Sequence, residues 1–223
     1  MKSNLKVLLF TRKELKEELD INNIRKKFKL MNVIYDNEFN YKTKKLKKRY
    51  DFLISYRSKK ILDDRILKKA SCAAVNFHPG PPEFRGIGCA NFALIKNVKF
   101  YGFTIHVMDR KVDHGKILLS KKFKIKKNTT ITRLLKQTHS LMKKSFLKFI
   151  KDISLGKFSK YKLKNSSNID WSKKMYSKKN LENLYKIKLP IKKKELEKII
   201  RATSYKKFKP FIIVNGYKFV LTT

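Results

Sequence analysis

Short apolar runs separated by longer polar or amphipathic stretches mark the first third of the chain. Each run is five or six residues long and apolar almost throughout, which is typical of strands covered on both faces of a parallel sheet. We predict strands at 6–10, 31–35, 51–56 and 73–77. Between the first two, Leu15, Leu19 and Ile24 recur at near-helical spacing and predict a helix over 12–29. The pattern indicates an α/β fold with a mostly parallel sheet.

A segment rich in proline and glycine interrupts this alternation at 78–86, with three prolines and two glycines in nine residues. Proline fixes φ and lacks an N–H, so we predict a rigid loop there. A short helix over 89–96 follows. Alternating apolar positions then predict a strand over 100–108, which a strand over 116–125 could join after a connecting loop.

The clearest helical periodicity follows Thr129 and Thr130, either of which could cap the helix, and continues to Ile150. We place the end of a first domain, 1–155, just beyond it. The remainder, 156–223, is predicted to be an extension of linker, helix and β-hairpin.

Within this extension, 156–180 is polar and rich in Lys, Ser and Asn, which predicts a linker or a surface-hugging segment. Pro190 suits the first turn of a helix that runs to residue 200. Two β-prone arms in 210–221 flank Asn215 and Gly216, a pair that tolerates positive φ and predicts a β-hairpin.

The charge of the chain is extreme, because 57 Lys and Arg stand against 17 Asp and Glu, a net +40. Hydrophobic residues still make up 42%, enough to exclude a wholly disordered polycation. Such a charge points first to nucleic acid or an anionic surface. However, 48 of the 57 basic residues are Lys, they are spread from Lys2 to Lys218, and Asn is abundant. Drift toward AT-rich codons and a selected anionic partner both stay open.

The two cysteines, Cys72 and Cys89, match neither a zinc-ligand pair nor Cys-x-x-Cys, so we expect a reducing compartment and no metal. No apolar run approaches the roughly 18 residues that span a bilayer, and the N-terminus lacks the apolar stretch of a secretory signal. The sequence predicts a soluble cytoplasmic protein without a membrane partner.

The strand at 73–77 brings candidate chemistry to its carboxyl end. Asn76 and His78 project to the same side of an extended backbone, at the edge where open α/β sheets bind ligands. An amide and an imidazole side by side can donate to one oxygen, and the imidazole can move a proton near neutral pH. They could instead merely anchor the proline loop. Of the other histidines, His106 alternates with the buried face of its strand, and His114 lies in a loop beside Asp113.

Three separated blocks, in this order, carry a resemblance. The first is Asn76-Phe-His78 with the Pro/Gly loop that ends at Arg85-Gly86, the second is 102–109 (GFTIHVMD), and the third is 112–115 (VDHG). The sequence resembles the folate-dependent formyltransferases, among them methionyl-tRNA, glycinamide ribonucleotide and sugar-nucleotide N-formyltransferases. The resemblance implies a Rossmann-like, mostly parallel sheet. It covers about 51–150, with weaker echoes at 171–176 and 200–203.

The resemblance also implies roles for individual residues. Formyl transfer to an amine passes through a tetrahedral intermediate with an oxyanion, which Asn76 and a protonated His78 would stabilise. Asp113 would orient His78 and help to relay the proton that leaves the amine.

The formyl donor implied by the resemblance is N10-formyltetrahydrofolate, held mainly by the backbone of two loops. The corresponding residues here are Ser55, Tyr56, Arg57, Met108, Asp109 and Val112. Two departures lie near this expected site. The loop at 80–83 is one residue shorter than in most members, and Arg57 stands where many have Gly.

The acceptor implied by the resemblance is a primary amine. About 70 residues follow the core, which is short for the barrel-like domain usual in methionyl-tRNA formyltransferases. We therefore favour a small molecule or a nucleotide sugar as the acceptor. Transfer to tRNA is the alternative, which the +40 charge would suit. A non-catalytic, basic RNA-binding protein is a second alternative. The C-terminal region could pair two copies in a homodimer.

Overall fold

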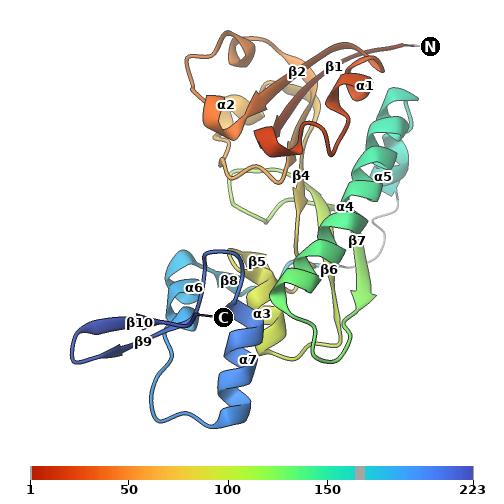
Figure 1. Cartoon of the computed structure of the whole chain (residues 1–223). Helices are drawn as coiled ribbons and strands as arrows, with labels where there is room; N and C mark the ends of the chain where they lie inside the picture. Colours follow the sequence, from red (N-terminus) through yellow and green to blue (C-terminus); the bar gives the residue numbers. More distant parts are fainter. Residues whose placement is uncertain (1, 164–168, 223) are drawn as a thin grey trace. The chain divides into compact units, whose positions relative to one another are not determined.

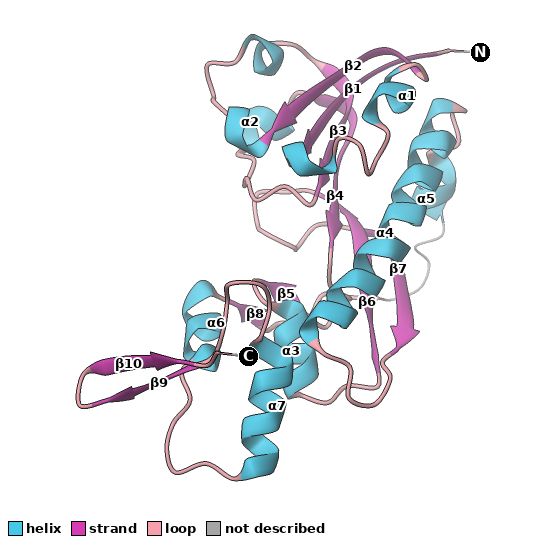
Figure 2. Ribbon diagram, viewed as in Figure 1, coloured by secondary structure: helices cyan, strands magenta, loops and turns pink. Residues whose placement is uncertain are grey.

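The computed structural model describes residues 2–163 and 169–222. Its centre is a six-stranded sheet in the order β2-β1-β3-β4-β6-β7 (Figure 2). The strands β2, β1, β3 and β4 pair in parallel, whereas β6 is antiparallel to β4. The sheet strands are β1 (Ser3–Thr11), β2 (Phe28–Tyr35), β3 (Tyr50–Tyr56), β4 (Ala70–His78), β6 (Phe100–Val107) and β7 (Ile117–Lys124). The predicted α/β fold with a mostly parallel sheet is confirmed, and all six predicted strands are present.

Helices and short strands connect and extend this sheet (Figure 1). The 3-10 helices are η1 (Lys13–Leu15), η2 (Asp36–Glu38) and η3 (Lys44–Lys47). The α-helices are α1 (Ile21–Arg25), α2 (Asp64–Leu67), α3 (Cys89–Ile95), α4 (Ile131–Ser154), α5 (Ser159–Leu163), α6 (Lys178–Tyr185) and α7 (Lys193–Thr203). The remaining strands are β5 (Arg85–Gly86), β8 (Met175–Tyr176), β9 (Phe211–Val214) and β10 (Tyr217–Val220).

The chain divides into two compact units, each assembled from three segments. Unit 1 comprises Met1–Pro79, Phe103–Ser120 and Leu141–Asp170, and unit 2 comprises Gly80–Gly102, Lys121–Ser140 and Trp171–Thr223. Each unit contains residues from both sides of the predicted boundary. The boundary at 155/156 therefore stays a prediction.

Unit 1 has apolar side chains on both faces of its strands. On one face, Val75 and Phe77 of β4 pack with Ile54 and Tyr56 of β3 against the aromatic side of α4, which includes Phe146. On the other face, a smaller cluster includes side chains of β1, β3, β4 and α2. Because burying one large apolar side chain contributes about 1.5–3 kcal/mol, these two layers supply much of the stability of the unit.

The predicted helix over 12–29 is wrong. The structure has only η1 and the five-residue α1 there, and β2 already begins at Phe28. Asp20 takes a left-handed conformation, with φ 49°, and its side chain accepts a hydrogen bond from the Asn23 N–H. A carboxylate that caps a new helix interrupts a longer one. The apolar spacing was nonetheless informative, because Leu15, Leu19 and Ile24 are all buried.

The predicted linker over 156–180 is also wrong in part, since α5, β8 and the start of α6 lie within it; residues 164–168 lie outside the described residues. The helix predicted to start at Pro190 begins instead at Lys193, with Lys192 at its N-cap. The segment 156–180 is polar in sequence, but α5 belongs to unit 1, and the part from Trp171 onward belongs to unit 2, where specific contacts hold it. Arg85, for example, donates from Nη1 to the Ser172 carbonyl, 3.0 Å away.

The predicted terminal hairpin is confirmed. β9 and β10 pair antiparallel, with Val214 opposite Tyr217. Asn215 and Gly216 both have positive φ, 47° and 83°, as a two-residue hairpin turn requires. Over the described ranges, none of the helices has the length and hydropathy of a bilayer-spanning segment.

Candidate active site

A row of polar side chains crosses three strands of unit 1 near their ends. The sheet register places Ser55 opposite Asn76 and Asn76 opposite His106. Two residues further along β4, His78 is opposite Thr104. Side chains at paired positions share a face of a sheet, as do those two residues apart along a strand. We call this polar set, Ser55, Asn76, His78, Thr104 and His106, the site face.

Asp113 joins the site face from the loop between β6 and β7. Its Oδ2 lies 3.2 Å from Nδ1 of His78, and its Oδ1 lies 3.5 Å from Nε2 of His106. Asp113 is only 5% exposed and His78 only 4%. In such a dry setting an ion pair between them is weakly screened by solvent. The structure therefore brings together the three residues to which the sequence assigned chemistry, Asn76, His78 and Asp113.

Close backbone contacts hold the loop that carries Asp113. The Val107 N–H donates to the Lys116 carbonyl at 2.8 Å, which closes the base of the loop. A Cβ on Gly115 would lie 2.0 Å from the Val107 oxygen, so only glycine fits there. Asp113 itself has φ 46°, in the left-handed region that Asp tolerates better than most residues. Both Gly115 and Asp113 are thus residue types that suit the backbone conformation of this loop.

Asp109 and His114 join the two sides of the same loop. Nδ1 of His114 donates to Oδ2 of Asp109 at 2.8 Å, and the Lys111 N–H donates to Oδ1 at 2.9 Å. Burial favours the neutral acid, but these hydrogen bonds and the nearby imidazoles outweigh it and lower the pKa of Asp109. The Asp109 carboxylate is therefore ionised at neutral pH and serves to shape the loop.

His106 is the site residue that the sequence analysis missed. Its Nε2 lies 3.1 Å from Nδ2 of Asn76, and its Nδ1 lies 2.9 Å from the Val107 carbonyl oxygen. It is 2% exposed. The alternation along its strand had indicated burial, but the polar partner that makes burial tolerable comes from β4, thirty residues away in the sequence.

The three predicted donor-binding residues at the end of β3 do not all face the same way. Ser55 is on the site face, whereas the Tyr56 ring is fully buried on the opposite face, beside Phe146. Burial there raises the pKa of Tyr56 well above its ordinary value. Arg57 has φ 53° and directs its guanidinium to Glu18, 3.6 Å away. Only the backbone of Tyr56 can therefore meet a ligand at the site face.

The backbone at this strand end is anchored by the end of β1, the neighbouring strand in the sheet. Thr11 donates from Oγ1 to the Tyr56 carbonyl, at 2.9 Å, and Arg12 donates from Nε to the Arg57 carbonyl, at 2.7 Å. Just beyond, Asp36 accepts hydrogen bonds from the Ser58 hydroxyl and the Lys59 N–H. The loop after β3 therefore has a fixed course, although Arg57 occupies a position that would suit glycine.

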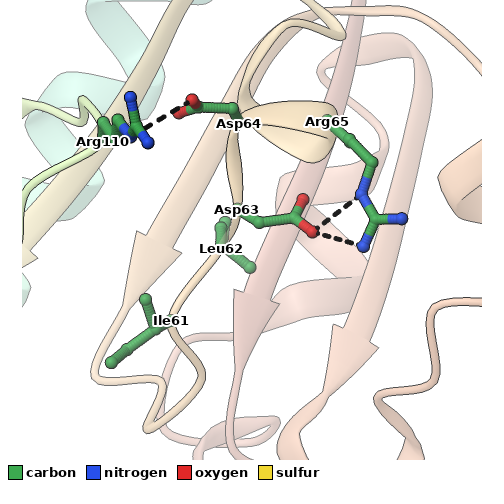
Figure 3. A pocket seen from close by; sticks show the side chains of 6 residues that line it. All are labelled: Ile61, Leu62, Asp63, Asp64, Arg65 and Arg110. Atoms are coloured by element: carbon green, nitrogen blue, oxygen red, sulfur yellow. Dashed lines mark hydrogen bonds and ion pairs between the residues drawn. The ribbon is translucent and has the colours of Figure 1, made fainter.

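The other predicted donor-binding residues lie in the loop after β6. Met108 is half-buried and its N–H donates to the Ala74 carbonyl, whereas Val112 is exposed. Between them, Arg110 contributes to a pocket of about 380 Å³ that segment 61–65 otherwise lines. Figure 3 shows Asp64 directed toward Arg110 and Asp63 toward Arg65. The loop after β6 and the segment 61–65 therefore line the same pocket.

This arrangement can perform acid–base chemistry at an oxygen. Asn76 supplies amide donors, and His78 supplies an imidazole whose protonated form Asp113 stabilises. Amide and imidazolium donors directed at one oxygen stabilise negative charge that develops on it. The site face is therefore suited to a reaction at a carbonyl group.

Comparison with known proteins gives a family for the chain. The family model described as formyl transferase matches residues 12–150, more than half of the chain. Among curated proteins, the chain is 36% identical over 88 residues to the bifunctional polymyxin resistance protein ArnA of Wigglesworthia glossinidia brevipalpis. It is 38% identical over 85 residues to methionyl-tRNA formyltransferase of Clostridium tetani. These matches cover 39% and 38% of the chain but only 14% and 27% of the two relatives.

Solved structures align with the chain over greater lengths. A 4-N formyltransferase from Francisella tularensis has a TM-score of 0.74 at 22% identity, covering 98% of this chain and 97% of that one. An N-formyltransferase from Helicobacter canadensis, solved with folinic acid and dTDP-3-aminofucose, has a TM-score of 0.69 at 18% identity, covering 95% and 85%. At these identities the similarity shows the fold. Together with the family match, it means that the chain belongs to the formyl transferase family.

Proposed function

We propose that the protein transfers a formyl group from N10-formyltetrahydrofolate to the primary amine of a nucleotide-linked sugar. The observation that carries this proposal is the placement of Asn76 beside His78 on one face of the sheet, with the buried Asp113 carboxylate 3.2 Å from the His78 ring. Membership of the formyl transferase family supports it.

The amide of Asn76 and the imidazolium of His78 would act together on the formyl oxygen. As the amine adds to the formyl carbon, that oxygen gains negative charge, and both donors interact with it more strongly than with the neutral carbonyl. The loss of one such donor typically costs about 3–4 kcal/mol of barrier. Asp113 favours the charged form of His78 and thereby keeps the second donor available.

His78, beside Asp113, would also transfer the proton that the amine releases. Since Nδ1 of His78 is directed at Asp113, Nε2 is the ring atom that would exchange protons with the reacting groups. The imidazolium would give its Nε2 proton to the nitrogen of the donor as the bond from that nitrogen to the formyl carbon breaks, and the neutral ring would then take the proton that the amine releases. The carboxylate balances the ring charge throughout, as an orienting carboxylate does beside a catalytic imidazole. This requires a buried carboxylate, as observed for Asp113.

The donor would be held where the loops after β3 and β6 approach each other. When bound, it supplies the activated formyl group. The pocket of about 380 Å³ is of the size that binds small molecules. Arg110, which lines it, faces Asp64 with its Nε, and the remaining N–H groups of the guanidinium would donate to an anionic group of the donor. The backbone of Ser55, Tyr56 and Arg57, and of Met108, Asp109 and Val112, would provide the remaining contacts.

Two observations support a sugar amine as the acceptor. The chain aligns with 97% of a sugar N-formyltransferase from a Shewanella species and with 85% of the Helicobacter N-formyltransferase that was solved with dTDP-3-aminofucose. A further relative, the GDP-perosamine N-formyltransferase of Brucella melitensis, is 32% identical over 81 residues. The methionyl-tRNA relatives and the +40 charge keep transfer to tRNA as the alternative acceptor.

A direct assay separates these acceptors. The protein would be incubated with N10-formyltetrahydrofolate and either a panel of nucleotide-linked amino sugars or charged initiator tRNA. We expect product with a nucleotide sugar, and a loss of about 100- to 1,000-fold in kcat for Asn76→Ala and His78→Ala. Matched controls are Asn22→Ala, an exposed asparagine of α1, and His139→Ala on α4. Product with tRNA alone would assign the alternative acceptor, and RNA binding without any transfer would support the non-catalytic alternative.

The homodimer is a separate part of the proposal. The hairpin β9–β10 exposes apolar side chains, among them Ile213, Tyr217 and Phe219, which are 45%, 74% and 56% exposed. A patch of this kind on a basic surface often marks a contact with another protein chain. Sedimentation velocity would test it, because Phe219→Lys should yield a monomer. A wild-type protein that is monomeric at high micromolar concentration would contradict it.

A further inference from the structure

His106 occupies the centre of the site face without a role in the scheme above. It lies directly opposite Asn76 on β6 and is almost fully buried. Its two ring nitrogens face different groups, the Val107 carbonyl at Nδ1 and the Asn76 amide at Nε2. A buried imidazole held at both nitrogens has its protonation state fixed by its neighbours.

The contact at Nδ1 identifies the tautomer. A backbone carbonyl only accepts hydrogen bonds, so at 2.9 Å from the Val107 oxygen Nδ1 must carry a hydrogen. In a neutral ring Nε2 then has a lone pair and accepts. At 3.1 Å it receives an N–H of Asn76, which places the amide nitrogen, rather than the amide oxygen, toward the ring. The second N–H of the same amide is then available to the proposed formyl oxygen.

A protonated His106 would reverse this arrangement. An N–H on Nε2 would face the N–H of Asn76 and would favour rotation of the amide so that its oxygen accepts instead. It would also compete for Asp113, whose Oδ1 is 3.5 Å away, against His78 at the other carboxylate oxygen. The titratable groups that face His106 are Asp113, His78 beyond that carboxylate, and Asp109.

We infer that His106 is a positioning residue: its neutral Nε2 holds the Asn76 amide with a donor toward the reacting oxygen and leaves the charge of Asp113 to His78. The inference rests on the proposed function for its consequence in catalysis. It also makes a statement about the free protein, namely that the His106 ring carries a hydrogen on Nδ1 and accepts a hydrogen bond at Nε2.

Two substitutions separate the hydrogen bond from simple packing. His106→Leu fills the space without an acceptor, so the amide can rotate, and kcat should fall roughly 10- to 100-fold. His106→Gln can return an acceptor to the Nε2 position without a titratable group. It should recover most of the activity and make the acid side of the pH–rate profile less steep. Ile105→Val is the matched control, since it alters the opposite face of the same strand, and it should leave kcat within about twofold of wild type.

Nuclear magnetic resonance of protein labelled with ¹⁵N in histidine tests the tautomer without any turnover. The His106 resonances, assigned by their absence in His106→Gln, should show the Nδ1–H form at neutral pH. An Nε2–H form would overturn the inference, as would a His106→Leu variant that folds and retains kcat within about twofold. If wild-type protein formylates no acceptor, the proposed function fails while the tautomer measurement still decides the role of His106.

Discussion

The two faces of strands β3, β4 and β6 share one backbone but carry side chains of different chemistry. One face presents Tyr56 and Phe77 to the aromatic side of α4, whereas the other presents Asn76, His78 and His106 to one another and to Asp113. Neighbouring residues in the sequence thus belong to different environments. Phe77, between Asn76 and His78, lies with its ring beside Tyr56 and Phe146 instead.

One short stretch of sequence can therefore serve stability and chemistry separately. Side chains on the aromatic face gain free energy from burial and ring contacts. Those on the site face are buried with polar partners, which limits their stabilising effect but fixes their orientation. Substitutions on the aromatic face should therefore change the free energy of unfolding, and those on the site face should change the reaction barrier.

The largest effect is expected at Phe77. Its ring contacts Tyr56, Phe146 and Phe149 at centroid distances of 5.6, 5.3 and 5.6 Å. Phe77→Ala should lower the free energy of unfolding by about 3–5 kcal/mol, measured by urea denaturation. Phe77→Leu, which retains much of the volume, should lose less than half as much. A loss below about 1 kcal/mol for Phe77→Ala would show that the aromatic face is loosely packed.

On the site face, Asn76→Ala should change the reaction barrier more than the free energy of unfolding. The reaction barrier should rise by about 3 kcal/mol, read from kcat, because one donor to the formyl oxygen is lost. The free energy of unfolding should change by only about 1 kcal/mol, the net value of its hydrogen bond to His106. A large fall in stability with little change in kcat would reverse the comparison.

Asp113→Asn should have a smaller effect on the reaction barrier than Asn76→Ala. It keeps the shape of the side chain but removes the charge beside His78. Since the protonated ring is then less favoured, kcat should fall about 10- to 100-fold and the optimum of the pH–rate profile should move to lower pH. An unchanged optimum would mean that Asp113 does not control the protonation of His78.

The smallest effect is expected at Asp152, a carboxylate at the border of the aromatic face. Tyr161 donates from its hydroxyl to Oδ2 of Asp152 at 2.7 Å, and Lys148 lies 3.5 Å away. Although burial opposes it, the hydrogen bonds from Lys160 and Tyr161 lower the pKa of Asp152. A lowered pKa contributes stability above the ordinary Asp range that is lost as the pH falls through the folded value.

Asp152→Asn should therefore be less stable than wild type by about 1 kcal/mol at pH 7. The difference should shrink steadily below about pH 4, where the wild-type carboxylate takes up its proton. Urea unfolding at pH 7, 4 and 2.5 measures it. A difference that grows toward low pH would exclude the stabilising role of this carboxylate.

Much of unit 1 could be predicted from the sequence because its strands are short and apolar and its sheet is buried on both faces. The helix over 12–29 could not, since its periodicity reflects burial of Leu15, Leu19 and Ile24 by a chain that bends at Asp20. Periodicity reports which side chains are buried, and a series of turns can bury the same set as a helix.

Some residues of the candidate site could be predicted from the sequence and others could not. Asn76, His78 and Asp113 followed from a resemblance in their motifs. Tyr56 could have been set apart from Ser55 by alternation alone, because adjacent residues of a strand face opposite ways. The partnership of His106 with Asn76 depends on the antiparallel register of β6 against β4, which no local pattern specifies.

Gly115 shows how a sequence motif can record a steric requirement. Because a Cβ there would meet the Val107 oxygen, the spacing from Asp113 to the following glycine is set by two backbone segments that approach closely. If residues 110–116 were randomised and clones selected only for soluble expression, glycine should still be recovered at 115, whereas Asp113 should be free to vary. Selection for formyl transfer would then restore Asp113, so that two rounds of selection would separate the part of the motif that folding requires from the part that chemistry requires.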